Sequence, residues 1–268
     1  MPSSAPTNTP DDAAHAQPPR HLFILSGSSR GMGLAMAQQL LQPGHTLIGI
    51  ARTASAELQA QAPQGATLEQ WTLDLADAPA AADRLRQWLD GLDASRFASA
   101  TLINNAGVIP PIAPLSDSDP AALAQALRVG LEAPMLLTGA FLGATSGWTL
   151  PRKVLNISSG LGRRPMASQS AYCAAKAGMD HFTRCVALDE AARPHGARVC
   201  SLAPGVIDTA MQTQLRGAAP ERFPDAGNFA ALKSQGMLTS PEEAARRVLA
   251  WLQRPDFGQQ PVADVREG

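Results

Sequence analysis

The chain has 268 residues, a length that suits one α/β domain with a three-layer core. Its formal net charge is -1 and its sequence pI is about 6.5, with no run of basic residues. This balance argues against a protein that binds nucleic acid or an anionic membrane surface. No stretch approaches the ~20 consecutive apolar residues that a membrane helix needs, so we predict no membrane partner.

The first segment, 1–20, contains Pro, Ser, Thr, Asp and Ala with almost no large apolar residue. We predict a flexible N-terminal tail, followed by a single domain over 21–268. The tail lacks the apolar core of a secretory signal, and its two acids argue against a transit peptide. The three cysteines, Cys173, Cys185 and Cys200, lack metal-ligand spacing, so we expect buried free thiols in the cytoplasm and no metal.

A strand-like run over 21–26 leads into a glycine-rich turn and then into a helical stretch over 32–42. Glycine allows a tight turn and a close approach of the backbone, and a helix N-terminus offers free amides to a pyrophosphate. A turn of this kind between a first strand and a first helix predicts nucleotide binding. The predicted cofactor residues are Gly27, Ser29, Arg30, Gly31, Met32 and Gly33.

The second strand, 46–50, is followed by Ala51, Arg52 and Thr53, without an acid. A site that prefers NAD is expected to place a carboxylate here, where it accepts from the ribose 2′-hydroxyl. Arg52 and Arg30 together can instead clamp a 2′-phosphate, because a guanidinium group bonds phosphate in a bidentate manner. The sequence therefore predicts NADP(H) as the cofactor.

A buried strand over 152–157 ends in Ser158, Ser159 and Gly160. In an open α/β sheet, ligands lie beyond the carboxyl ends of the strands. We therefore expect Ser159 to face the ligand crevice, where its hydroxyl can bond a substrate carbonyl oxygen. The alternative is that both serines are ordinary turn residues.

Tyr172, the only tyrosine, lies four residues before Lys176 in a predicted helix over 168–192. This spacing places the phenol and the ammonium on one helix face. A free phenol titrates near pH 10, and a neighbouring cation is expected to lower that pKa toward the range of a general acid. The alternative is one packed ring and one solvated amine.

The whole chain alternates between strand-like and helical stretches, which predicts an α/β fold with a single Rossmann-type doubly wound parallel sheet and helices on both faces. The segment 209–235 has weaker periodicity, and we expect an irregular lid there. Its apolar residues either line the pocket or pack on the sheet: Met211, Leu215, Phe223, Phe229 and Leu232. Strands are predicted near 21–26, 46–50, 67–73, 100–104, 152–157, 197–202 and 261–265, and helices near 32–42, 79–90, 120–143, 168–192 and 241–253.

With these motifs in this order, the chain resembles the short-chain dehydrogenase/reductase family from about 21 to 264. The resemblance implies that Ser159, Tyr172 and Lys176 are catalytic, and that family members pair through helices near 120–143 and 168–192, as a homodimer or homotetramer. It also implies cofactor contacts from an adenine-binding pair, an NNAG motif and a segment along the nicotinamide: Asp74, Leu75, Asn105, Ala106, Gly107, Pro204, Gly205, Ile207 and Thr209.

A narrower resemblance, over 152–159, 202–212, 232–236 and 252–264, is to sepiapterin reductases and bacterial benzil-reductase-type members of this family. It implies a small carbonyl substrate, either a vicinal dicarbonyl or a pterin with a side-chain diketone. It also implies that Asp264 anchors the substrate; the alternative is a solvated terminal carboxylate.

One position departs from the family pattern: Gly130 stands where the family has a fourth catalytic residue, an asparagine. Glycine costs roughly 1 kcal/mol in a helix interior and can itself permit a kink. A water bonded to backbone carbonyls can occupy the space of the missing amide. The substitution therefore predicts either a weaker proton relay or a protein without catalysis.

The function predicted from the sequence is NADPH-dependent reduction of a ketone or vicinal dicarbonyl. Tyr172 gives the proton, Lys176 lowers the phenol's pKa and bonds the ribose, and Ser159 bonds the carbonyl oxygen. The alternative is an NADP(H)-binding sensor or partner-binding protein without catalysis, supported by Gly130. A third interpretation, an oxidative alcohol dehydrogenase, is disfavoured by Arg30 and Arg52.

Overall fold

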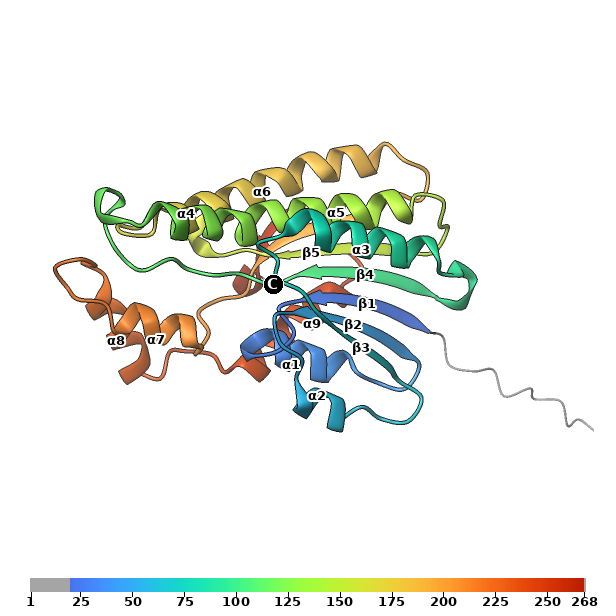
Figure 1. Ribbon diagram of the computed structural model, residues 1–268, viewed down its shortest axis with the longest axis horizontal. Helices are drawn as coiled ribbons and strands as arrows, with labels where there is room; N and C mark the ends of the chain where they lie inside the picture. Colours follow the sequence, from blue (N-terminus) through green and yellow to red (C-terminus); the bar gives the residue numbers. More distant parts are fainter. Residues whose placement is uncertain (1–19, 268) are drawn as a thin grey trace, which may run out of the picture.

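A computed structural model describes residues 20–267 (Figure 1). The predicted tail, 1–20, lies outside the described residues except for Arg20. Within the described part, seven parallel strands form one sheet in the order β3-β2-β1-β4-β5-β6-β7. The strands are β1 (His21–Ser26), β2 (His45–Ala51), β3 (Thr67–Thr72), β4 (Ser99–Asn104), β5 (Arg152–Ile157), β6 (Arg198–Ala203) and β7 (Val262–Asp264).

Helices cover both faces of this sheet, which confirms the predicted Rossmann-type fold. One layer contains α3, α4, α5 and α6, and α1 and α9 lie together on the opposite face (Figure 1). The helices are α1 (Gly31–Leu40), α2 (Ala56–Ala60), α3 (Ala78–Asp90), α4 (Pro120–Leu127), α5 (Ala133–Ala144), α6 (Ser170–Ala191), α7 (Ala210–Arg216), α8 (Ala226–Ser234) and α9 (Pro241–Gln253).

The strands are buried because successive side chains enter opposite layers. In β1, Leu22 and Ile24 join the core beneath α3 and α5, whereas Leu25 joins the core beneath α1 and α9. The order β3-β2-β1-β4 reverses the winding direction between β1 and β4. In such sheets the ligand crevice lies at this switch point, outside the carboxyl ends of the strands.

The predicted helix over 120–143 is interrupted in the structure. A π-helical turn, Arg128–Glu132, separates α4 from α5, and Gly130 lies at its centre. Such insertions are a recognised cause of bends in otherwise regular helices. The combined stretch Pro120–Ala144 is long and apolar enough to cross a membrane by length and composition, contrary to our expectation that no stretch approaches this limit. Half of its most apolar window is buried, as in the core helices of soluble proteins.

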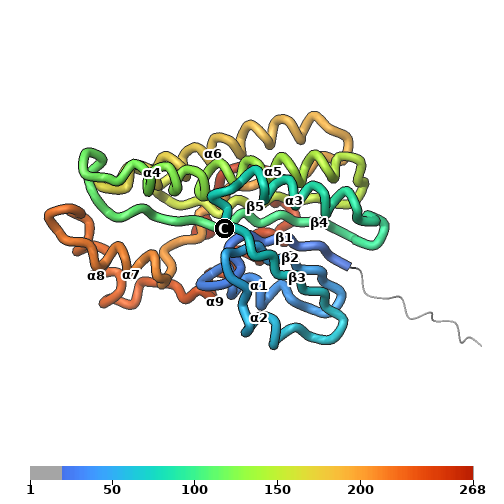
Figure 2. The backbone as a smooth tube through the Cα atoms, in the orientation of Figure 1, coloured from blue at the N-terminus to red at the C-terminus, as the bar shows by residue number. Residues whose placement is uncertain are grey.

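The predicted irregular lid over 209–235 contains two helices, α7 and α8, so the prediction of an irregular segment was wrong. These helices lie beyond the strand ends, beside the loop that follows β4 (Figure 2). They enclose a small core of their own, separate from the sheet, in which the rings of Phe223 and Phe229 stack at 5.6 Å. Both helices are short and are separated by Gly217, Pro220 and Pro224, which masked their periodicity.

Two smaller differences concern single elements. The short helix α2 was not predicted; it begins at Ser55, whose side chain accepts a hydrogen bond from the Leu58 amide. Of the three cysteines, Cys200 is buried, Cys173 is half-buried and Cys185 is exposed, so the prediction of burial was wrong for Cys185. Cys185 lies on the outer face of α6, away from the sheet.

Candidate active site

A cavity of about 1190 Å³ lies outside the carboxyl ends of the strands. Every residue that we predicted to bind cofactor or substrate contributes to its wall. The cavity therefore brings together segments from β1 to β7 that are more than 200 residues apart in the chain. Those residues are Gly27, Ser29, Arg30, Gly31, Met32, Gly33, Arg52, Asp74, Leu75, Asn105, Ala106, Gly107, Ser159, Tyr172, Lys176, Pro204, Gly205, Ile207, Thr209 and Asp264.

The turn after β1 requires glycine at two positions. Gly27 has a φ of +73°, and a Cβ there would lie 2.8 Å from the side-chain nitrogen of Asn105. A Cβ on Gly33 would lie 1.9 Å from the Gly27 carbonyl oxygen, so α1 can approach the turn only without a side chain. Asn105, the residue after β4, holds this turn in place, because its side-chain amide donates to the Ser26 carbonyl oxygen at 3.0 Å.

This turn leads directly into α1, whose first turn contains no acidic residue. The N-terminus of α1 and the exposed Arg30 therefore present positive potential to the cavity. Arg52, after β2, is exposed on the same wall. Neither arginine forms an ion pair within residues 20–267. Asp74, which we predicted to contact adenine, is exposed on the cavity wall and accepts from the Ala76 amide at 2.9 Å.

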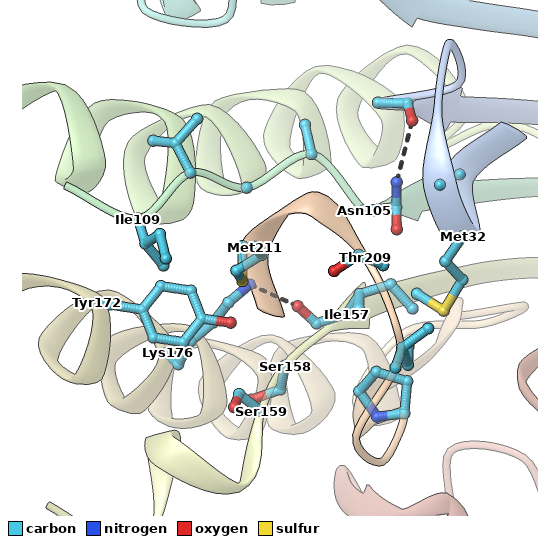
Figure 3. A pocket seen from close by; sticks show the side chains of 18 of the residues that line it. Met32, Asn105, Ile109, Ile157, Ser158, Ser159, Tyr172, Lys176, Thr209 and Met211 are labelled. Carbon is cyan, nitrogen blue, oxygen red and sulfur yellow. Dashed lines mark hydrogen bonds between the residues drawn. The ribbon is translucent and has the colours of Figure 1, made fainter. Parts of the chain in front are cut away.

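Ser159, Tyr172 and Lys176 lie together at the other end of the cavity (Figure 3). Ser159 follows β5, whereas the other two lie on one face of α6. The Lys176 ammonium is 5.7 Å from the centre of the Tyr172 ring. It donates a hydrogen bond to the Ile157 carbonyl oxygen at 2.7 Å, which holds the lysine against the end of β5.

The pKa values of this pair differ from the prediction. Burial raises the pKa of Tyr172 to about 12, and a hydrogen bond with Ser159 only partly opposes that rise. Burial lowers the pKa of Lys176 to about 8, while the nearby Asp180 carboxylate opposes the change. The predicted lowering of the phenol's pKa is therefore not found in this structure: the pKa is raised, and desolvation is the largest cause.

Asp264, at the end of β7, lies on the wall of the cavity with its carboxylate buried. The guanidinium of Arg266 donates to both carboxylate oxygens, at 2.8 and 2.6 Å. This hydrogen bonding holds the pKa of Asp264 below its ordinary value. The carboxylate predicted to anchor the substrate therefore lines the cavity, but its charge is already paired with Arg266.

Three further side chains at the site were not predicted. Gln212 lines the cavity and is buried, and its amide oxygen has no hydrogen-bond partner within residues 20–267. Arg163 lies on the turn after β5, and Asp180 lies on α6. Asp180 follows Lys176 at the same spacing by which Lys176 follows Tyr172, and this stripe was a signal available in the sequence.

The apolar lid residues that we singled out divide into two groups. Met211, Leu215 and Phe229 line the cavity. Phe223 and Leu232 do not line it; they contribute to the small core of the lid. Among the described residues, no group of histidine, cysteine or acidic side chains is arranged to hold a metal ion. The site thus combines a glycine-rich turn suited to a nucleotide, the Tyr172 phenol with the Ser159 hydroxyl beside it, and a partly apolar cavity wall.

Comparison with known proteins agrees with this geometry. A family profile described as short chain dehydrogenase matches residues 21–219. Benzil reductase ((S)-benzoin forming) of Bacillus cereus is 36% identical, and the match covers 91% of this chain and 98% of that protein. Sepiapterin reductase of Meriones unguiculatus is 32% identical over 87% of this chain and 92% of its own length. The crystal structure of a short-chain dehydrogenase/reductase from Burkholderia vietnamiensis has 35% identity and a TM-score of 0.62, and the match covers 92% of this chain and 98% of that one.

Proposed function

The chain belongs to the short-chain dehydrogenase family and is an oxidoreductase that acts on carbonyl compounds, and from this premise we propose that it reduces vicinal dicarbonyls with NADPH. The observation that carries the proposal is the arrangement of Ser159, Tyr172 and Lys176 in one cavity with the glycine turn. The product is the hydroxyketone: one carbonyl gains a hydride at carbon and a proton at oxygen.

Each of the three side chains Ser159, Tyr172 and Lys176 has a separate role in this reaction. Bound NADPH would supply the hydride. The Tyr172 phenol gives its proton to the forming alkoxide, and a neutral phenol is the state that its raised pKa maintains at neutral pH. Ser159 donates to the same oxygen where negative charge develops. Lys176 holds a positive charge beside the phenol and so stabilises the phenolate that remains after proton transfer.

The family binds NAD or NADP, and the wall of this cavity favours NADP. Arg30 and Arg52 line the adenosine end without carboxylate partners within residues 20–267. No acidic residue follows β2 to bond a ribose 2′-hydroxyl. Two guanidinium groups suit a 2′-phosphate, since each can donate two parallel hydrogen bonds to it.

A dicarbonyl fits the substrate end better than a pterin. A pterin amino group would need the Asp264 carboxylate, which Arg266 already occupies. Gln212 is buried on the cavity wall, and its amide NH2 group, rather than its oxygen, which has no partner within residues 20–267, would donate to the second, unreduced carbonyl oxygen. The relatives named benzil reductase act on a compound of this class by name, which supports the same choice.

The alternative, a cofactor-binding protein without catalysis, rested on Gly130. In the structure this glycine is the centre of the π-helical turn that faces α6. The helix is thus already distorted without the family asparagine, and this favours the enzyme over the sensor.

We also propose a homo-oligomer in the cytoplasm. Four large apolar side chains are exposed on or beside α4, α5 and α6, and Leu188 is 75% exposed. Burying such a patch against a second copy would remove apolar surface from water. The three free cysteines suit a reducing compartment. The exposed apolar residues on these helices are Leu127, Met135, Leu136 and Leu188.

The function is tested by following NADPH oxidation with benzil, a simple aliphatic 1,2-diketone and sepiapterin, and by repeating the assay with NADH. We expect turnover of the diketones and a higher kcat/KM with NADPH. Tyr172→Phe should lower kcat at least about 100-fold while the Kd for NADPH changes little. Retained turnover in this variant would contradict the mechanism, and silence with all three carbonyls would contradict the substrate class.

A further inference from the structure

Asp180 is a buried carboxylate on the face of α6 that also carries Tyr172 and Lys176. Asp180 is only 2% exposed, and it lies one helical turn after Lys176. A charged carboxylate in this position is costly unless hydrogen bonds and an opposite charge compensate for lost water. Its partners therefore indicate what the carboxylate does in the fold.

Those partners come from three separate segments around the cavity. The hydroxyl groups of Ser158 and Ser201 both donate to Oδ1 of Asp180, each at 2.6 Å. The Arg163 guanidinium donates to Oδ2 at 3.4 Å, and its other arm donates to the Ala263 carbonyl oxygen at 2.6 Å. One carboxylate thus joins the ends of β5 and β6, the turn after β5 and, through Arg163, the residue before Asp264.

The turn after β5 is shaped to reach this carboxylate. A Cβ on Gly162 would lie 2.9 Å from Oδ2 of Asp180 and 3.0 Å from the Lys176 carbonyl group. Only glycine allows the backbone to approach α6 this closely. The same turn begins with Ser159, whose hydroxyl accepts from the Leu161 amide at 3.2 Å. The contact with Asp180 therefore helps to determine where the Ser159 hydroxyl lies.

Asp180 also affects the charge of Lys176. The Lys176 side chain is buried, and its ammonium has one hydrogen-bond acceptor, the Ile157 carbonyl. Desolvation favours the neutral amine, and the Asp180 carboxylate is the charge that opposes it. Two titratable groups on α6 face this lysine: Tyr172 and Asp180. Asp180 in turn faces Arg163 on the turn after β5 and Cys200 on β6, and Arg163 also acts on Asp264 at the end of β7.

We propose that Asp180 is a positioning residue of this active site: it fixes the turn that carries Ser159, and its charge keeps Lys176 in the ammonium form. The inference rests on the proposed function, because Lys176 acts there as a cation. Asp180 itself does not line the cavity. Its effect is carried by the Ser158 hydroxyl and by the lysine one turn away.

The test compares two carboxylates buried on the same helix. Asp180→Asn keeps the size of the side chain and one acceptor oxygen for the hydroxyls of Ser158 and Ser201, but it removes the charge and the oxygen that accepts from Arg163. Glu190→Gln is the matched control, because Glu190 is also buried on α6, where it pairs with Arg152 and accepts from the Ala197 amide, far from the cavity. Asp180→Glu restores the charge at the first site.

In Asp180→Asn we expect the alkaline limb of the kcat profile with a diketone to move about one unit to lower pH. At pH 8, kcat should fall about fivefold, because the ammonium fraction falls from about one half to about one eleventh, with a smaller change in the diketone KM. Glu190→Gln should lower Tm without moving the alkaline limb of the kcat profile. In Asp180→Glu, which keeps a negative charge, the alkaline limb should lie close to that of the wild type. If Asp180→Asn does not fold, Asp180→Ser is the second neutral variant.

A stability measurement separates failure of this proposal from failure of the proposed function. The free energy of unfolding should rise as pH passes upward through the folded-state pKa of Lys176. That rise should begin at lower pH in the neutral variant, whether or not the protein reduces any carbonyl. The inference would be overturned if a folded neutral variant kept the wild-type pH for both the alkaline limb of kcat and the rise in the free energy of unfolding.

Discussion

Lys176→Met should make the protein more stable at neutral pH while abolishing its activity. The lysine side chain is buried beside Tyr172, and its pKa falls from 10.5 to about 8. The group therefore binds its proton more weakly in the folded than in the unfolded chain. By linkage, holding the charge in the fold costs free energy at every pH below the folded-state pKa.

The magnitude follows from the size of that change. From 10.5 to about 8 is about 2.5 pKa units, or about 3 kcal/mol of destabilisation at pH 7. Methionine fills a similar volume but leaves the Ile157 carbonyl without its donor, which costs about 1 kcal/mol. The expected net gain is about 2 kcal/mol. Asp180 loses a nearby cation in the variant but keeps Ser158 among its hydrogen-bond partners.

The sign of the pH dependence is also determined. Because the folded-state pKa lies below the unfolded-state value, the wild type gains stability as pH rises from about 8 toward 10.5. The advantage of Lys176→Met should therefore be largest at pH 7 and should shrink in that window. Urea unfolding at pH 7 and pH 9.5 measures both quantities, and Lys233→Met at the surface is the control. A variant no more stable than wild type at pH 7, or an advantage that does not shrink, would refute the reasoning.

Two further predictions concern single positions at the site. Gly130→Asn should lower Tm, because a Cβ at this position would lie 3.2 Å from the Cβ of Ala175. Adding Ala175→Gly should restore Tm. If the double variant oxidises NADPH faster than Ala175→Gly alone, the native glycine weakens the proton relay. Arg266→Ala should free the carboxylate of Asp264 and raise kcat/KM for sepiapterin relative to benzil about tenfold. An unchanged ratio of the two substrates would show that the ion pair does not control specificity.

Much of the fold could be predicted from short stretches of sequence. The strands and the long helices occur where apolar runs and helical periodicity indicated them, because each buried element must carry its own apolar face. The short helices α7 and α8 were missed, since they are stabilised by contacts of Phe223 and Phe229 with each other and with the loop after β4. The π-helical turn at Gly130 was foreseen only as a kink.

At the candidate site, too, the sequence predicted which residues are neighbours but not how they are charged. Tyr172 and Lys176 are neighbours on one helix face, so their proximity follows from a spacing of four residues. Their pKa values do not follow from it, because burial depends on every segment packed around them. The prediction for Tyr172 had the wrong sign for this reason. Similarly, the sequence contains both Asp264 and Arg266 but does not show that the two are paired.

The sequence by itself determined the doubly wound sheet, the glycine turn that we propose binds a nucleotide, and the serine, tyrosine and lysine that we propose are catalytic. These are properties of local spacing, which the chain carries wherever it folds. Only the tertiary structure decided how these groups are charged and held. Ser158, Arg163 and Ser201 meet on the carboxylate of Asp180 because β5 and β6 are neighbours in the sheet and α6 packs across them. Desolvation and pairing of this kind arise from contacts between distant segments, and no single stretch of sequence contains them.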